Sequence, residues 1–372
     1  MRRPLSVFGL ALLALSLAAQ SGAAQVMRWG GRVEVPVEVP GSESIVQVDA
    51  GNANGYGVTS SGSVLAWGRG IDGALGRGSR KSSNAAVRVQ LPAGVQVVSL
   101  GEAERSGFAV TSTGHVFDWG MNKHGDLCLG GAEGEEAEAA AVTTPREVPG
   151  VSEAVAVQGA KNHVLILLAN GTVETCGWGP KGQLGLGKSI SEVTSPQLVP
   201  GLSHVVEVSA GPQVSAARTA SGEVLVFGSN IEGQVGMGGS SAPVFTPTRL
   251  ALPGPASSIS VGGGSPLAHT EALVNGVPYC WGSDLAGECG DGTERQKDVP
   301  TVASALATLG PLRSVKAAGL STMALTASGD VYTVGGEGEL GIPSGAASFL
   351  PQFVEGGVSE ISATAEDHLE LG

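Results

Sequence analysis

Residues that could carry catalysis or bind a metal are few and scattered in this 372-residue chain. Its six histidines include no pair spaced i, i+4 in a helical pattern, which excludes a metal site of the His-Glu-x-x-His type. The sequence also has no Gly-x-Ser-x-Gly nucleophile turn, no phosphate-binding glycine loop that opens a helix and no Asp-x-Asp-x-Asp-Gly calcium loop. We therefore predict no catalytic residue, no metal site and no cofactor.

Three histidines recur at one position of an internal repeat, which is described below: His163, His269 and His368. Other copies of the repeat hold a hydroxyl residue at this position: Ser106, Ser215 and Thr322. A position that accepts histidine, serine or threonine suits a hydrogen-bonding turn residue better than a catalytic base. We expect these side chains to stabilise the fold.

The most conspicuous loop is an insertion at residues 130–142, GGAEGEEAEAAAV. Its four acidic residues are Glu133, Glu135, Glu136 and Glu138. We interpret these glutamates as candidate partner-binding residues, together with Lys123 and His124 in the preceding loop and the segment 240–247. An acidic loop can bind a basic protein or calcium, because variable surface loops often carry recognition. The alternative interpretation is a solvated loop that binds nothing.

Four cysteines follow the N-terminal region: Cys128, Cys176, Cys280 and Cys289. An even number in an exported chain permits disulfides, and four cysteines allow three connectivities. Cys280 and Cys289 lie in one short segment, so we expect this pair to form a disulfide; the alternative is small buried thiols. A zinc site is not expected, because the sequence has no Cys-x-x-Cys pair.

Residues 1–24 have the features of a secretory signal peptide. Arg2 and Arg3 precede an apolar stretch rich in leucine and alanine, and Gly22-Ala23-Ala24 supplies the small residues that signal peptidase requires. The alternative is an uncleaved membrane anchor or a buried helix. We expect an exported protein, in the periplasm, at the cell surface or in the medium, with residues 25–372 as the mature domain.

The charge and hydropathy of the chain restrict its partners. The protein has 21 Lys and Arg against 34 Asp and Glu, which gives a formal net charge of −13. Such an acidic surface repels phosphate backbones, so we do not expect a nucleic-acid partner. No later stretch reaches the roughly 20 apolar residues that span a bilayer, so we expect no membrane insertion after the leader is removed. The mature domain is expected to be a monomer with an unidentified protein partner.

An internal repeat of about 50 residues covers the mature chain. Seven anchors combine a hydrophobic residue with glycine: Trp29-Gly30, Trp67-Gly68, Trp119-Gly120, Trp178-Gly179, Phe227-Gly228, Trp281-Gly282 and Val334-Gly335. Six turn glycines precede anchors and lie 51 to 57 residues apart: Gly62, Gly114, Gly171, Gly222, Gly276 and Gly329. A Gly-x-Leu-Gly type element follows six anchors, as in Gly182–Gly185.

Each repeat contains short apolar runs of strand length that are separated by glycine, serine and asparagine, and this pattern favours strands over helices. Radial repetition of four-stranded sheets produces a β-propeller. We therefore predict an all-β, seven-bladed β-propeller. Val26 stands three residues before Trp29, as Val64 stands before Trp67, so the segment 25–30 is expected to supply the strand that closes the last blade.

These elements resemble the repeat of the regulator of chromosome condensation family. The resemblance is clearest in Gly159 to His163, Asn170-Gly171, Trp178-Gly179 and Gly182–Gly185, and it covers residues 25–372. It implies a propeller of about 50-residue repeats, and together with the leader it implies an exported bacterial-type member. The family's namesake is a nucleotide-exchange factor for a nuclear GTPase that docks on nucleosomes. One group of exported members inhibits β-lactamases by protein–protein contact.

The sequence favours a non-enzymatic exported scaffold that recognises a protein through its inter-blade loops. One alternative is an envelope hydrolase or lyase with a site in the central funnel, where polar groups from distant repeats would meet. A cluster of inward carboxylates and a histidine with perturbed pKa values would support that alternative. A guanine-nucleotide-exchange role is the other alternative, which the leader and the acidic charge disfavour.

Overall fold

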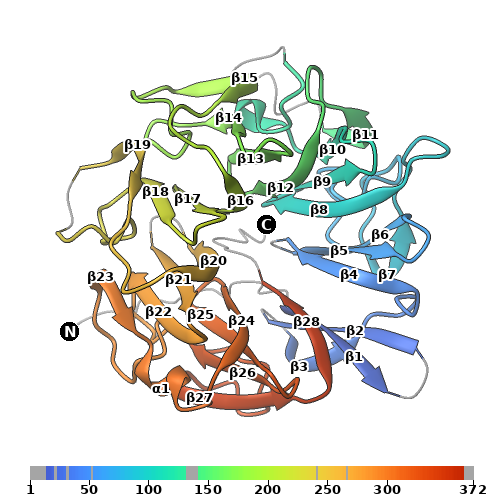
Figure 1. Ribbon diagram of the computed structural model, residues 1–372. Coiled ribbons are helices and arrows are strands. Elements are labelled where there is room, and N and C mark those ends of the chain that lie inside the picture. Colours follow the sequence, from blue (N-terminus) through green and yellow to red (C-terminus); the bar gives the residue numbers. More distant parts are fainter. Residues whose placement is uncertain are drawn as a thin grey trace, which may run out of the picture.

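The fold is built almost entirely of strands. The computed structural model describes residues 14–20, 23–30, 33–51, 53–130, 141–239, 242–264 and 267–363. Within these residues, 28 strands are accompanied by one 3-10 turn, η1 (Lys123–Gly125), and one short helix, α1 (Ser304–Ala307). The strands pair into seven four-stranded antiparallel sheets that are arranged radially (Figure 1). The predicted all-β propeller is confirmed.

The strands occupy four positions in the sheets. The first strands surround the centre: β4 (Ile45–Ala50), β8 (Val97–Ala103), β12 (Ala154–Gly159), β16 (Val205–Gly211), β20 (Ala256–Gly263), β24 (Leu312–Ala317) and β28 (Val358–Ser362). The second strands are β5 (Asn54–Thr59), β9 (Ser106–Thr111), β13 (His163–Leu168), β17 (Val214–Thr219), β21 (Ala268–Val274), β25 (Ser321–Thr326) and β1 (Ala14–Gln20). The third strands are β6 (Val64–Gly68), β10 (Val116–Gly120), β14 (Val173–Trp178), β18 (Val224–Gly228), β22 (Val277–Gly282), β26 (Val331–Gly335) and β2 (Ala23–Gly30). The outer strands are β7 (Ser83–Arg88), β11 (Val142–Glu147), β15 (Glu192–Leu198), β19 (Val244–Arg249), β23 (Lys297–Val302), β27 (Ser348–Glu355) and β3 (Val33–Glu38).

Neighbouring sheets pack through a repeated contact between a tryptophan and a glycine. Trp119 and Trp281 are fully buried. A Cβ built on Gly76 would lie 3.0 Å from Cδ1 of Trp119 in the next sheet, and one on Gly236 would lie 2.7 Å from Cδ1 of Trp281. Both glycines have positive φ and end a Gly-x-Leu-Gly type element, so backbone conformation and space both require glycine. This contact explains why the two repeat signals recur together.

The anchor of the fourth repeat differs from the sequence prediction. Gly177 pairs with His163, as Gly68 pairs with Asn54, and its φ of 99° matches the 97° of Gly68. Cys176-Gly177, rather than the expected Trp178-Gly179, therefore corresponds to the other anchors. The prediction was wrong here because a Trp-Gly pair stands two residues beyond the equivalent position.

Both ends of the described chain contribute to one composite sheet. Its order is β28-β1-β2-β3, whereas the other six sheets each consist of consecutive strands. The sequence prediction assigned a single closing strand to the segment 25–30. In the structure three strands come from the N-terminal region, and β1 lies within the predicted leader.

The composite sheet contacts the following sheet as other neighbours contact each other. The backbone N–H of Ala50 donates to Ser362 Oγ over 3.1 Å, as the N–H of Val261 donates to Ser209 Oγ over 2.9 Å. Figure 1 shows β28 between β24 and β4. The same type of side chain to backbone bond therefore links first strands at both junctions.

Candidate functional site

The first strands form a mouth of exposed valines at the centre of the molecule. Each of β4, β8, β12 and β16 has a β-bulge near its start, which interrupts its pairing with the second strand. The bulged residues are valines that are 45 to 58% exposed: Val46, Val98, Val155 and Val206. A bulge re-aims a side chain that regular alternation would place in the sheet. Four successive sheets thus present apolar side chains around one part of the central opening.

An acidic cavity of about 220 Å³ continues inward from this region. Val206 and Glu207 both line it, so the cavity begins next to the valine mouth. Its charged lining residues come from distant repeats: Asp49, Glu102, Glu104, Glu207 and Lys316. The cavity is therefore a place where the carboxylates of several sheets converge, as the funnel hypothesis required.

Asp49 and Glu360 are two carboxyls on adjacent first strands. Ser362 Oγ donates to Asp49 Oδ1 over 3.0 Å, and Glu360 Oε2 accepts the N–H of Val48 over 3.3 Å. Burial raises the pKa of Asp49, and burial together with the Asp49 charge raises the pKa of Glu360 to about 7. Near neutral pH a large fraction of Glu360 therefore carries a proton.

No histidine lines the cavity among the described residues. His163 is completely buried, and its Nε2 lies 2.8 Å from Ser215 Oγ in the next sheet. Ser215 Oγ donates to the carbonyl of Gln183, so the histidine must donate to the serine. Burial lowers the pKa of His163 to about 3, which keeps the ring neutral. This serine–histidine contact joins two sheets and has no access to a substrate, in agreement with the expected structural role.

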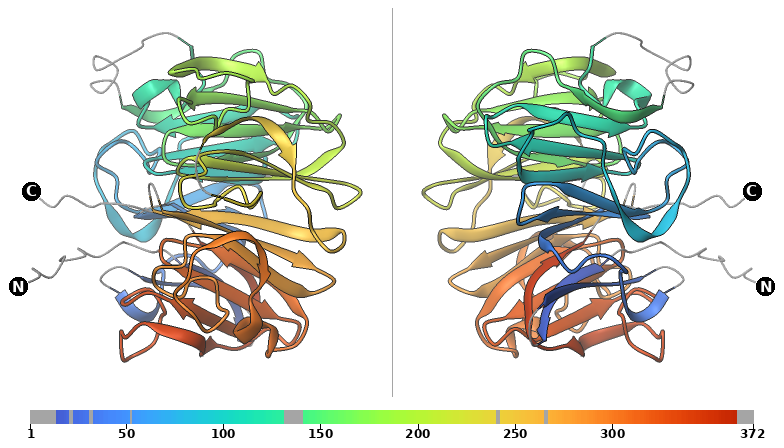
Figure 2. Two further views of the ribbon diagram at one scale, coloured as in Figure 1. Left: turned by 90° about the vertical axis from the view of Figure 1, so that its left-hand side faces the viewer. Right: turned by 90° about the vertical axis from the view of Figure 1, so that its right-hand side faces the viewer.

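The loop with the predicted binding residues Lys123 and His124 is held against the next sheet. His124 Nδ1 lies 3.1 Å from Glu192 Oε2 on β15, and its ring lies 6.2 Å from that of Trp178. The N–H of Gly130 donates to the carbonyl of Thr194 on the same strand over 2.7 Å. The loop is therefore anchored to the next sheet both within η1 and after it, and η1 projects from one face of the disc (Figure 2). The glutamates of the insertion, Glu133, Glu135, Glu136 and Glu138, lie outside the described residues.

Two disulfides fix neighbouring parts of the structure. Cys280 is bonded to Cys289, the pair expected from sequence proximity. Cys128 is bonded to Cys176, so both remaining cysteines are paired as well. Cys128 ends the second Gly-x-Leu-Gly type element and has φ 57°, close to the 58° of Gly76. Since Cys176 occupies the tryptophan position of the next sheet, this disulfide replaces the glycine–tryptophan contact.

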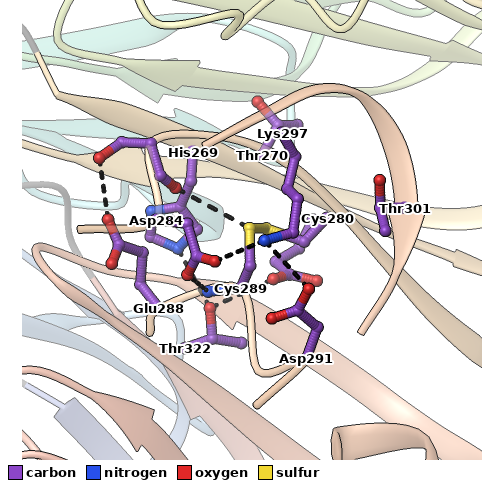
Figure 3. The surroundings of a disulfide bond; sticks show 12 residues. His269, Thr270, Cys280, Asp284, Glu288, Cys289, Asp291, Lys297, Thr301 and Thr322 are labelled. Atoms are coloured by element: carbon purple, nitrogen blue, oxygen red, sulfur yellow. Dashed lines mark hydrogen bonds and ion pairs between the residues drawn. A yellow bond between two sulfur atoms is a disulfide. The ribbon is translucent and has the colours of Figure 1, made fainter. Parts of the chain in front are cut away.

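The Cys280–Cys289 bond lies beside a buried carboxylate (Figure 3). Asp284 accepts the N–H of Cys289 over 2.9 Å through Oδ1, and Lys297 Nζ lies 2.7 Å from its Oδ2. Lys297 Nζ also lies 3.0 Å from Asp291 Oδ2. Burial raises the pKa of Asp284 to about 6 despite the lysine. The disulfide and this ion pair together hold the loop after β22.

Comparison with known proteins identifies the repeat. The sequence profile of the Regulator of chromosome condensation (RCC1) repeat matches residues 170–218 and 221–268. The chain contains RCC1 repeats. The matched repeats begin at Asn170 and Ser221, immediately before two of the turn glycines that revealed the internal period. The resemblance inferred from the sequence is confirmed at the level of the repeat.

Curated relatives are similar to this chain over much of its length. The Ultraviolet-B receptor UVR8 of Arabidopsis thaliana is 27% identical over 276 residues, which cover 73% of this chain and 60% of the receptor. The E3 ubiquitin-protein ligase HERC2 of Homo sapiens is 30% identical over 286 residues, which cover 74% of this chain but 6% of the ligase. The chain thus spans less than two thirds of either relative.

A solved structure shares the fold of this chain. Prp20p from Saccharomyces cerevisiae superposes with a TM-score of 0.75 at 23% sequence identity, over 98% of this chain and 93% of that one. No helix in the described ranges is long and apolar enough to cross a membrane.

The valine mouth and the acidic cavity were not predicted from the sequence. A signal for the mouth is present in the paired apolar residues that open the first strands: Ile45-Val46, Val97-Val98, Ala154-Val155 and Val205-Val206. Regular alternation would make the second residue polar if it faced solvent. The cavity has no comparable local signal, because its residues meet only when the sheets close around the centre.

Proposed function

We propose that this protein is an exported, non-enzymatic RCC1-type scaffold that binds a protein partner, and that its mature form is a seven-bladed propeller of residues 25–372. The observation that carries the proposal is the valine mouth above the acidic cavity. Exposed apolar groups rimmed by charge are typical of protein interaction sites on otherwise polar surfaces. The partner segment that fits is apolar with an adjacent basic side chain.

Related structures support protein recognition as a use of this fold. The crystal structure of Prp20p has been described together with its binding properties to Gsp1p and histones. Yeast RCC1 (Prp20) has also been crystallised with Kap60. For the present chain, two disulfides and the leader-like N-terminus support export into an oxidising compartment, where such a partner would be met.

The inter-blade loops offer a second contact surface. Consecutive strands in each sheet are antiparallel, so the loops after the third strands all leave at the same end of the molecule. The loop after β10 contains Lys123 and His124, and the loop after β18 contains Ile231, which is 44% exposed. Leu285, in the loop after β22, is 56% exposed. The valine mouth lies at the beginning of the first strands and therefore at the opposite end.

The test is a crosslinked pull-down from the native envelope and secreted fractions, with the processed protein as bait. Val98→Ser/Val155→Ser removes apolar surface at the mouth, and Ile231→Ser/Leu285→Ser is the matched change at the loop end. We expect one saturable partner that is lost with the first pair and kept with the second. Loss with the second pair alone, or with deletion of residues 131–140, would transfer recognition to the loops. Absence of any saturable partner would contradict the proposal.

The Asp49–Glu360 pair favours one second candidate function, an envelope hydrolase or lyase. A carboxyl that is protonated near pH 7 beside a second carboxyl can act as a general acid. This candidate predicts turnover that Glu360→Gln abolishes while partner binding is retained. Screening envelope glycans and peptides with the wild type and this variant tests it directly.

A further inference from the structure

The composite sheet contains one position that the leader occupies. β1 is the second strand and pairs antiparallel with both of its neighbours, β28 and β2. If residues 1–24 are removed on export, β1 disappears and β28 and β2 face each other across the width of one strand. Each would then expose an unpaired edge inside the ring, and unpaired backbone groups at such an edge are unfavourable.

The repeat assigns a different segment to the same position. In each consecutively built sheet, the second strand follows directly after the first. Thr322 of β25 stands seven residues after Val315 of β24, and Ser215 stands seven after Val208. His368 likewise stands seven residues after Ile361 of β28. By this count the counterpart of β25 (Ser321–Thr326) is the segment 367–372, whose placement is outside the described residues.

The residues of the leader strand and of this segment can be assigned to the same positions of the pairing register. Ser16 of β1 pairs with Met27 and with Ile361. In the neighbouring sheet, the corresponding position is Ala324, which pairs with Tyr332 and Val315. Transfer of that register places Glu370 opposite Met27 and Ile361, where Ser16 now lies.

The leucines coincide in the same register. Leu15 and Leu17 of the sequence Ala-Leu-Ser-Leu stand where the register places Leu369 and Leu371 of His-Leu-Glu-Leu. Both segments therefore have leucines at alternate positions of this register.

We propose that the leader strand β1 holds the position of residues 367–372 in the precursor, and that this C-terminal segment takes the position when the leader is removed. The inference rests on the proposed export and deepens it, because removal of the leader becomes the step that completes the sheet. The precursor and the mature protein would then differ in which end of the chain supplies the second strand.

A register-specific disulfide tests the exchange. Met27→Cys/Glu370→Cys places two thiols on directly opposite residues, at a separation that a disulfide can bridge. The full chain is expressed for export in two forms, one unmodified at the leader and one with Ala24→Leu, which places a large side chain where signal peptidase requires a small one. We expect the new disulfide in the processed chain and its loss in the Ala24→Leu chain. Peptide mass mapping distinguishes it from the two native bonds.

The matched control shifts the register by one residue. Met27→Cys/Leu371→Cys places the thiols on opposite faces of the sheet and should not form the bond in either chain. Equal crosslinking in the processed and unprocessed chains would overturn the exchange. So would its absence in a processed chain that keeps its native disulfides and its near-ultraviolet circular dichroism.

Failure of export is read out separately by intact mass. If the unmodified chain keeps residues 1–24, the export proposal is wrong. The crosslink is then measured in a chain that begins at Gln25, in which the position of β1 is vacant by design. A bond there supports the strand assignment, whereas a folded chain without the bond, or a chain that does not fold, contradicts it.

Discussion

The Cys128–Cys176 and Cys280–Cys289 bonds begin at neighbouring positions of equivalent elements, yet they join different parts of the propeller. Cys128 takes the glycine position of its Gly-x-Leu-Gly element, and Cys176 takes the tryptophan position of the next sheet. Cys289 takes the leucine position, and Cys280 stands directly before Trp281 of its own sheet. One bond therefore replaces packing between sheets and the other replaces packing within a sheet.

The difference shows that the repeat has two separable packing contacts. The contact between sheets depends on a glycine beneath a tryptophan, as for Gly236 and Trp281. The contact within a sheet joins the third strand to the loop that follows it, as where Thr333 Oγ1 donates to the carbonyl of Leu340. A cysteine pair can substitute for either contact, because each contact brings two backbone segments close enough for a disulfide.

The largest expected effect is the loss of stability when each disulfide is removed, and it depends on the length of chain that the bond closes. The bonds span 48 and 9 residues. Chain entropy then predicts that Cys128→Ala/Cys176→Ala lowers the free energy of unfolding by about 4 kcal/mol and Cys280→Ala/Cys289→Ala by about 2.5 kcal/mol. Urea unfolding of both variants, with the wild type alongside, measures the difference. Equal losses would mean that loop closure does not distinguish the two bonds.

Gly236→Ala tests the noncovalent contact between sheets. The new Cβ would crowd Trp281, and φ is 67°, so we expect a loss of about 3 kcal/mol from overpacking and backbone strain together. Gly239→Ala is the matched control, because its φ is 73° but nothing lies within 4 Å. The control should show the backbone cost alone. Thermal or urea unfolding that gives the same loss for both would remove the tryptophan from the explanation.

Restoring the usual residues tests whether the disulfide and the tryptophan contact are equivalent. Cys128→Gly/Cys176→Trp should be more stable than Cys128→Ala/Cys176→Ala by about 2 kcal/mol, since it regains a large buried side chain and a residue suited to positive φ. Both variants lack the bond, so their unfolding midpoints are compared in the same urea series. No gain would show that the fourth sheet has adapted to the disulfide.

The smallest expected effect concerns the junction of the composite sheet with β4, where a carboxyl provides part of the contact. The pKa of Glu360 is about 7 in the folded protein and higher than in the unfolded chain. Its contribution to stability is therefore full below about pH 4.5 and decreases as the pH rises to 7. Glu360→Gln should be more stable than the wild type by about 1 kcal/mol at pH 8 and nearly equal at pH 4. Thermal unfolding at the two pH values measures this, and a constant difference would contradict the charge argument.

The features that recur in every repeat could be predicted from the sequence. Turn glycines such as Gly171 and buried anchors such as Trp281 are local requirements of every sheet, so the period and the all-β propeller could be read directly. The same reasoning misplaced the fourth anchor, because Trp178 resembles an anchor in type while Cys176 occupies the position.

Features that arise between repeats were not accessible in this way. The Cys128–Cys176 bond depends on which residues of adjacent sheets face each other, which the misplaced anchor concealed. Asp49 and Glu360 are far apart in the chain and meet only at the centre. Val206 is exposed because of a bulge, whose position depends on pairing with the second strand. These properties come from the arrangement of sheets rather than from any one segment.

The composite sheet also has a consequence for circular permutation of the chain. β28 and β2 belong to one sheet although they lie near opposite ends of the described chain. A circular permutant that opens the chain at a tight hairpin such as Ser328-Gly329 and links residue 372 to residue 25 would preserve the neighbours of every mature strand. The sheet that now combines both ends would become an ordinary internal repeat, and another sheet would become the composite one.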